Sequence, residues 1–184
     1  MVDLIPNSSA YKQLRSFQKA TILYDLTHYF CQTYLRVGDR TVDQMVQAAR
    51  SGKQNIAEGV VASATSQEML LKLLNVAKAS LHELMIDYED YLRVHGYVQW
   101  EKDSAEVQEV RAWGKRENDP VFYMQLARER DAAYLANMAI VLIHQADYLL
   151  YRHLQSASER FMKEGGFREK LTRYRLAVRN KENR

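Results

Sequence analysis

The chain has 184 residues, of which 47% are hydrophobic and 27% charged, and this composition supplies enough apolar material for one compact domain with a real core. Its one cysteine, Cys31, excludes a framework of internal disulfides and fits a reducing compartment. The sequence shows no basic segment followed by an apolar run and no apolar stretch of about 18 residues, so we expect no signal peptide, no membrane span and a cytoplasmic location.

The net charge of +3 is distributed unevenly along the sequence. Residues 165–184 contain seven Lys/Arg and two Asp/Glu, which leaves 19 basic and 21 acidic residues in the rest of the chain. The body is therefore nearly neutral and the tail is basic. A basic tail of this kind can meet nucleic acid or an acidic partner, although it can also be a solvated surface.

Apolar residues at helical spacing predict three long helices in the first half of the chain, over residues 9–36, 42–62 and 66–94. Two capping boxes, with Thr41 and Thr65 as the N-cap residues, mark the starts of the second and third helices. Gly38, Gly59 and Gly96 each follow a helical pattern, where a left-handed residue is favoured. The second helix carries small residues along one seam, which let a neighbouring helix approach closely.

The second half begins with a linking segment, residues 97–130, in which a short helix is expected after Asp103. A fourth long helix starts at Pro120 or, more firmly, at Asp131, and it runs to about residue 163. The middle of this helix is apolar around most of its circumference, so it must be buried on more than one side. Either the linking segment or a second subunit would cover it.

A short final helix is expected within residues 165–184, after the double glycine. Its apolar residues lie within one narrow stripe, with basic residues on both flanks: Arg168, Lys170, Arg173, Arg175 and Arg179. A docking helix with a solvated basic side is the simpler interpretation. Contact with phosphate groups is the alternative.

These patterns predict an all-α protein built as an antiparallel up-down four-helix bundle, because long helices joined by short turns pack against their neighbours. We expect the bundle over residues 1–164, with a helical linker before the fourth helix, and the basic suffix helix over residues 165–184. No strand alternation of useful length and no repeat of 20–50 residues is visible.

Catalytic and metal sites are not indicated by any motif. Metal-binding bundles use Glu-x-x-His pairs, which this sequence lacks; the nearest arrangements are Asp25 with His28 and His144 with Asp147. Cys31 has no histidine at a motif spacing, and neither a G-x-S-x-G motif nor a phosphate-binding glycine loop occurs. We therefore expect no catalytic residues, no metal, no cofactor and no small-molecule substrate.

Rows of basic residues are the remaining chemical signal in the bundle. Lys12, Arg15 and Lys19 fall on one side of the first helix, and Arg50 and Lys53 lie one turn apart on the second. Such rows can bind phosphates, and affinity rises with the number of phosphates that are neutralised. Exposed helix surfaces also carry charges of this kind without binding anything.

The string QAARSGKQNIAEG, residues 47–59, resembles the signature of the four helix bundle family that includes the 23S rRNA intervening-sequence proteins. The following SQEMLLKLLNVAKASLHEL, residues 66–84, is similar to the next helix of that family, and the resemblance spans residues 11–97. Arg50, Gly52 and Lys53 depart from the commonest form of the signature. NMAIVLIHQADYLLYRHL and FMKEGGFREKLTRYR further resemble the subgroup called four helix bundle suffix domain proteins.

This resemblance implies an antiparallel bundle of bacterial origin that assembles into a homo-oligomer, pentameric by analogy with characterised relatives. One relative is an accessory protein that binds nucleic acid and a reverse transcriptase, and the family has no general enzymatic activity. The signature residues have a structural reading, in which the polar members Asn55 and Glu58 hydrogen-bond across a tight helix pair. The signature core is Asn55, Ile56, Ala57, Glu58 and Gly59.

Two hypotheses of function follow. In the first, the protein is a non-catalytic homo-oligomer that binds RNA or DNA as an accessory factor, through the basic rows and the basic tail. In the second, it is a protein-interaction scaffold with no nucleic-acid role, in which the apolar fourth helix and the aromatic linker make a large protein contact. Neither hypothesis includes a membrane or an enzymatic reaction.

Overall fold

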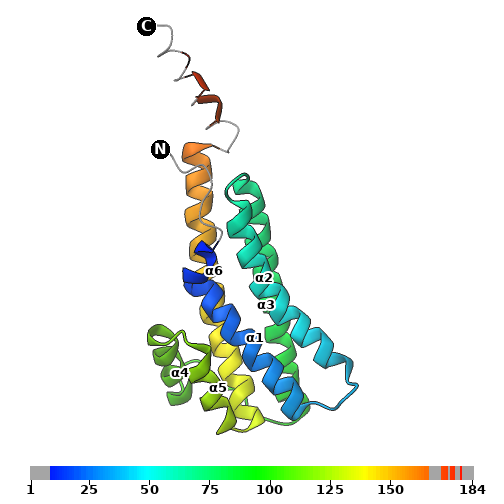
Figure 1. The fold of residues 1–184 in the computed structure, drawn as a ribbon. Helices are drawn as coiled ribbons and strands as arrows, with labels where there is room; N and C mark the ends of the chain where they lie inside the picture. The colour runs from blue at the N-terminus through cyan, green and yellow to red at the C-terminus, as the bar shows by residue number, and fades with distance from the viewer. Residues whose placement is uncertain (1–8, 166–170, 174, 177–178, 180–184) are drawn as a thin grey trace.

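The computed structural model describes residues 9–165, 171–173, 175–176 and 179, and the regular structure in this part of the chain is entirely helical (Figure 1). The all-α prediction is confirmed. In chain order the helices are the 3-10 helix η1 (Ala10–Gln13) and the α-helices α1 (Arg15–Tyr34), α2 (Arg40–Ala62), α3 (Gln67–Val94), α4 (Ala105–Arg116), α5 (Pro120–Arg128) and α6 (Ala132–Glu164).

The first expected helix, over residues 9–36, is interrupted near its start. Leu14 has an extended backbone with a ψ of 125° and separates η1 from α1. The interruption lets the ring of Tyr11 fold back against Phe17, with 4.8 Å between ring centroids, and the Gln18 side chain donates to the backbone oxygen of Lys12 at 3.1 Å. The prediction of one continuous helix was therefore wrong at this point.

The predicted helix starts are close to the observed ones, but other residues cap them. Asp39 caps α2 by accepting a hydrogen bond from the backbone N–H of Thr41, and Ser66 caps α3 by accepting from Met69. Thr41 and Thr65 were therefore the wrong N-cap residues. Gly96 follows α3 with a φ of 71°, as expected of a residue that ends a helix, whereas Gly59 lies inside α2.

α2 and α3, which residues 63–66 join, pack side by side along their length, and α1 and α6 complete the core around them (Figure 1). α1 contacts α2 and α6, and α6 contacts α3. The close contact between α2 and α3 depends on glycine, because a Cβ atom at Gly52 would lie only 2.7 Å from Cδ2 of Leu81. The small-residue seam predicted for residues 42–62 thus faces another helix.

The first half of α6 is buried on all sides, as its apolar sequence predicted. Nine consecutive residues, 135–143, are buried, and α4 supplies the outer cover through Val107 and Val110. The linking segment, through α4, therefore covers this part of α6, which is one of the two arrangements expected from the sequence. α6 starts after Asp131, which caps it by accepting from the Tyr134 N–H, while Pro120 starts the separate helix α5.

Figure 1 shows that α6 extends well beyond the start of α1, toward the turn between α2 and α3. α4 and α5 lie at the opposite end, where α5 packs against α1 and α4 packs against α6. Among the described residues, no helix has the length and apolar character that crossing a bilayer requires.

Candidate nucleic-acid interface

Lys12 and Arg15 lie where η1 meets the first turn of α1, and both side chains are exposed. No acidic side chain among the described residues forms an ion pair with either of them. The backbone N–H groups at the start of α1 add positive potential at the same place, because no side chain caps this helix. Their position therefore suits contact with an anion.

Lys19, one turn further along, is buried instead of exposed. Its side chain is 1% exposed, and Nζ donates to the backbone oxygen of Glu117 at 2.8 Å and to the Tyr123 hydroxyl at 3.4 Å. Burial and, to a smaller extent, the charge of Arg15 lower the pKa of Lys19 to about 8, against an opposing effect of Glu117. Lys19 joins α1 to the segment before α5 and is not part of an exposed basic row.

Arg50 and Lys53 lie one turn apart on α2, and they differ in exposure. Arg50 is exposed and has no ion-pair partner among the described residues. Lys53 is half-buried, with Nζ 3.9 Å from the centroid of the Tyr24 ring on α1, which is a cation–π contact. Burial raises the pKa of the neighbouring Asp25, and the charge of Lys53 opposes that rise.

Three of the predicted basic residues of the C-terminal segment lie in its described turns. Arg173, Arg175 and Arg179 are exposed, and Leu176 between them is 53% exposed. Arg168 and Lys170 lie outside the described residues. The bundle and the segment thus each present exposed cations.

The signature residues pack α2 against α3. Ile56 and Gly59 are buried, Ala57 is half-buried and Glu58 is exposed. Asn55 donates to the backbone oxygen and hydroxyl of Ser51 on its own helix, and the Ser51 hydroxyl shares a 2.9 Å hydrogen bond with Ser80 on α3. The link across the helix pair therefore runs through Ser51 and Ser80, and the expectation that Asn55 itself reaches across was wrong.

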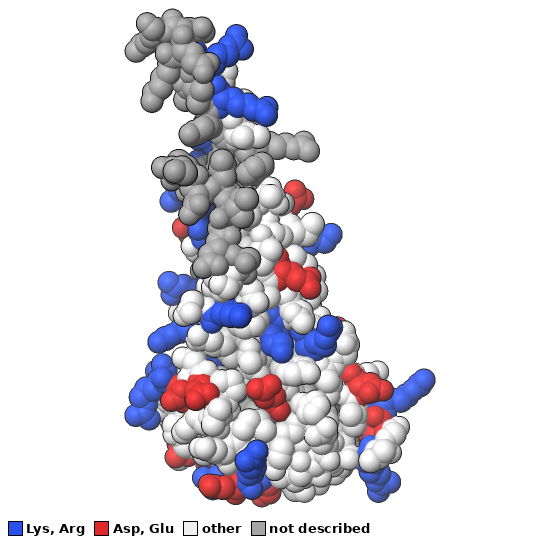
Figure 2. Space-filling view, viewed as in Figure 1, with Lys and Arg blue, Asp and Glu red and all other residues white. Residues whose placement is uncertain are grey.

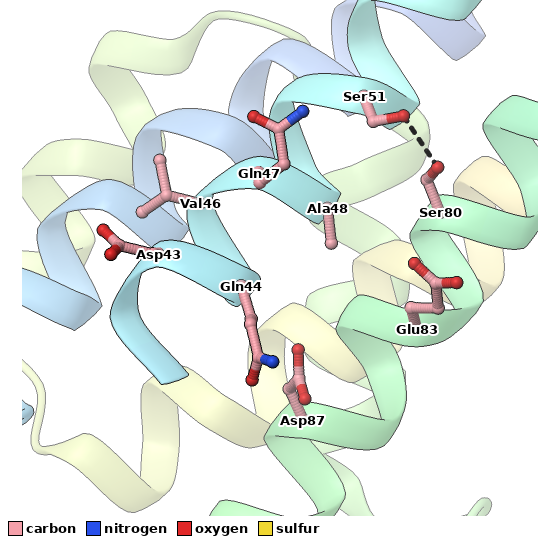
Figure 3. Close-up of a pocket in the computed structure, with 9 residues that line it drawn as sticks. All are labelled: Asp43, Gln44, Val46, Gln47, Ala48, Ser51, Ser80, Glu83 and Asp87. Carbon is pink, nitrogen blue, oxygen red and sulfur yellow. Dashed lines mark hydrogen bonds between the residues drawn. The ribbon is translucent and has the colours of Figure 1, made fainter. Parts of the chain in front are cut away.

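α2 and α3 also form a polar groove between them, with a volume of about 860 Å³ (Figure 3). Figure 3 shows the Ser51–Ser80 hydrogen bond at one end of the groove and the carboxylates of Glu83 and Asp87 along its α3 wall. Burial raises the pKa of Asp87, and the charges of Asp90 and Glu83 raise it further. The groove was not predicted from the sequence, although Glu83, Asp87 and Asp90 recur at helical spacing.

α2 thus carries cations and also forms one wall of a groove with carboxylates. Lys53 contacts α1 through the Tyr24 ring, and Asp43, Glu83 and Asp87 line the groove between α2 and α3. Figure 2 shows Lys and Arg side chains in a band across the middle of the face on which α1 lies, with mixed charges nearer α4 and α5. A polyanion would be attracted to the exposed cations and repelled by the carboxylates of the groove.

The contacts of His28, Asp147 and Cys31 are those of structural residues and not of a metal or catalytic site. Asp147 forms an ion pair with Lys78 of α3 at 3.0 Å, and His28 lies 3.4 Å from the Gln32 side chain. Among the described residues, no group of three or more His, Cys, Asp or Glu side chains could hold a metal ion. Burial raises the pKa of Cys31 to about 12, which keeps this thiol protonated near neutral pH.

Comparisons of the chain with protein-family models, with curated proteins and with solved structures found no match. The resemblance of residues 47–59 and 66–84 to a bundle family therefore stays a prediction from the sequence.

Proposed function

We propose that this protein is a non-catalytic, homo-oligomeric four-helix-bundle protein that binds RNA or DNA as an accessory factor in the cytoplasm. The observation that carries the proposal is the set of exposed cations Lys12, Arg15 and Arg50, which have no ion-pair partner among the described residues. Phosphate groups would neutralise them, and each neutralised phosphate releases counterions.

The architecture that goes with this proposal is an up-down bundle of α1, α2, α3 and α6. Its support is the packing of each of these helices against two others of the set, together with the short connections between α1, α2 and α3. The bundle-family resemblance adds an expectation of self-assembly, with a pentamer by analogy. The basic C-terminal segment would add further phosphate contacts through Arg173, Arg175 and Arg179.

A gel-shift titration at low salt tests the proposal, with the purified protein and labelled single-stranded RNA and DNA. The test variant replaces Lys12, Arg15 and Arg50 with Gln. The matched control replaces three exposed cations elsewhere, Lys72, Lys115 and Arg116, with Gln and so removes the same net charge. We expect the wild type and the control to bind and the test variant to bind about tenfold more weakly or worse.

Two results would contradict the proposal. The first is no binding of either nucleic acid by the wild-type protein at low salt. The second is equal weakening by the two triple variants, because that result would assign binding to net charge alone and not to these three residues.

A protein-interaction scaffold is the second candidate, and the groove between α2 and α3 favours it. The carboxylates of Asp43, Glu83 and Asp87 would repel a polyanion but would suit a basic protein surface. A pull-down with the full chain and with a chain lacking residues 165–184 separates the contribution of the bundle from that of the C-terminal segment. Retention of every partner by the shortened chain would remove the C-terminal segment as the docking element.

A further inference from the structure

The chain forms a second pocket, of about 390 Å³, where α4 and the segment before it pack against α6. This volume lies within the range of about 300–1,000 Å³ typical of small-molecule pockets. The floor is apolar and comes from Val107, Ile140 and Val141, each of which is buried. Trp100 adds an aromatic wall, so the inside of the pocket suits an apolar ligand body.

The aromatic wall is held in place by α6. The Asn137 side chain is 2% exposed; its oxygen accepts from the Trp100 backbone N–H at 2.8 Å, and its nitrogen donates to the backbone oxygens of Val98 and Ala133. The Trp100 ring also makes an edge contact with Tyr134, with 4.8 Å between ring centroids. A wall fixed in this way need not be ordered when a ligand enters.

The lining of the pocket is positively charged. Nη1 of Arg111 donates to the backbone oxygen of Lys102 at 3.1 Å, which places these two cationic residues together beside the apolar floor, and His144 also lines the pocket. Neither Arg111 nor Lys102 forms an ion pair in the part of the chain that the structure describes. Glu101 and Asp103 flank Lys102 in sequence, but neither lines the pocket.

We infer that this pocket binds a small organic carboxylate with an aromatic or short aliphatic body. The body would lie on Val107, Ile140, Val141 and Trp100, and the carboxylate would accept hydrogen bonds from Arg111 and Lys102. Charge-assisted hydrogen bonds of this kind are stronger than neutral ones, and the unpaired cations favour an anion over its neutral analogue. This ligand site contains none of the residues Lys12, Arg15 and Arg50, so either proposal can fail without the other.

Trp100 provides the readout for a binding experiment. The chain has two tryptophans, and Trp113 does not line the pocket, so Trp113→Phe leaves Trp100 as the one reporter. The probes are 4-phenylbutyrate, its neutral analogue 4-phenylbutyramide and inorganic phosphate. If Trp113→Phe impairs folding, isothermal titration of the wild-type protein with the same probes replaces the fluorescence measurement.

We expect 4-phenylbutyrate to shift the Trp100 emission to shorter wavelength in a saturable manner, with a Kd of about 10 µM to 1 mM. The neutral amide should bind about tenfold more weakly, and phosphate should compete poorly because it cannot use the apolar floor. Arg111→Gln and Lys102→Gln should each weaken carboxylate binding by about threefold to tenfold. The control Lys115→Gln, an exposed cation on α4 outside the pocket, should leave binding unchanged.

Three results would overturn the inference, provided that circular dichroism shows each variant to be folded. One is the absence of saturable binding of the carboxylate. Another is equal binding of the carboxylate and the amide, or equal competition by phosphate. The third is an unchanged Kd in both Arg111→Gln and Lys102→Gln.

Discussion

At the scale of single residues, Lys19 is a buried amine whose effect on the free energy of unfolding depends on pH. Its charged form is desolvated, so the pKa in the folded protein is about 8 instead of the ordinary 10.5. Below about pH 8, Lys19 is protonated in both the folded and the unfolded state. Folding then carries the full free-energy cost of burying the charged amine. Between the two pKa values the unfolded chain binds more protons, so the free energy of unfolding rises with pH.

We therefore expect wild-type stability to rise, relative to a Lys19→Met variant, by about 1–3 kcal/mol between neutral pH and pH 10. Urea unfolding followed by circular dichroism at several pH values measures this difference. The control is Lys72→Met, which removes an exposed lysine from α3. The free energy of unfolding of this variant should change with pH as that of the wild type does. A wild-type stability that falls relative to Lys19→Met over this range would contradict the burial of a charged Lys19.

The burial of Lys19 also shows that the exposure of a single side chain cannot be predicted from the local sequence. Arg15 and Lys19 are spaced to share one side of a regular helix, and that spacing is observed in α1. Their different exposure depends on α5 and the Glu117 backbone, which lie about 100 residues further along the chain. A local pattern places a side chain on a face, but contacts distant in sequence decide whether that face is covered.

At the scale of helices, Gly52 sets the distance between α2 and α3. Replacing it with alanine would improve helix propensity by about 1 kcal/mol, but the added methyl group would overlap Leu81. We expect Gly52→Ala to lower the free energy of unfolding by about 1–2 kcal/mol. Chemical denaturation measures the change.

A double-mutant cycle with Leu81→Ala identifies the cause of this loss. In that background the overlapping side chain is gone, so Gly52→Ala should become neutral or stabilising. The same loss of stability in both backgrounds would mean that Gly52 is not held close to Leu81.

Asn137 joins α6 to the extended segment before α4, because its side chain makes three hydrogen bonds while nearly fully buried. Asn137→Ala leaves the backbone groups of Val98 and Trp100 without these partners, so we expect a loss of about 2–3 kcal/mol and a red shift of the Trp100 emission. The control is Asn75→Ala, which removes one exposed hydrogen bond within α3 and should cost less than about 1 kcal/mol. Equal losses in the two variants would contradict this account.

Much of the helix layout could be predicted from the sequence, since apolar periodicity and capping residues are local signals. α3 and the start of α6 at Asp131 were located within a few residues. The break at Leu14 could not be predicted, because no local signal such as a proline or glycine marks it in the sequence. The groove between α2 and α3 was missed because its two walls come from separate helices whose rotation about their axes follows from core packing.

At the scale of the whole molecule, the proposal of a homo-oligomer makes a direct prediction of mass. One chain has a mass of 21.5 kDa, so multi-angle light scattering after size-exclusion chromatography should give a multiple of that value, and five times it for the pentamer expected by analogy. A mass that remains that of one chain across a wide concentration range would remove self-assembly from the proposal. The exposed cations and the groove between α2 and α3 would then be surfaces of a monomer.

The salt dependence of nucleic-acid affinity tests the central claim most directly. Fluorescence anisotropy with a labelled single-stranded oligonucleotide gives the slope of log affinity against log salt for the wild type, for the Lys12/Arg15/Arg50→Gln variant and for the Lys72/Lys115/Arg116→Gln control. Each lost phosphate contact reduces the magnitude of this slope by about 0.7, so the first variant should lose about 2 and the control about zero. Equal slopes for all three proteins, or no measurable binding by the wild type, would contradict the account.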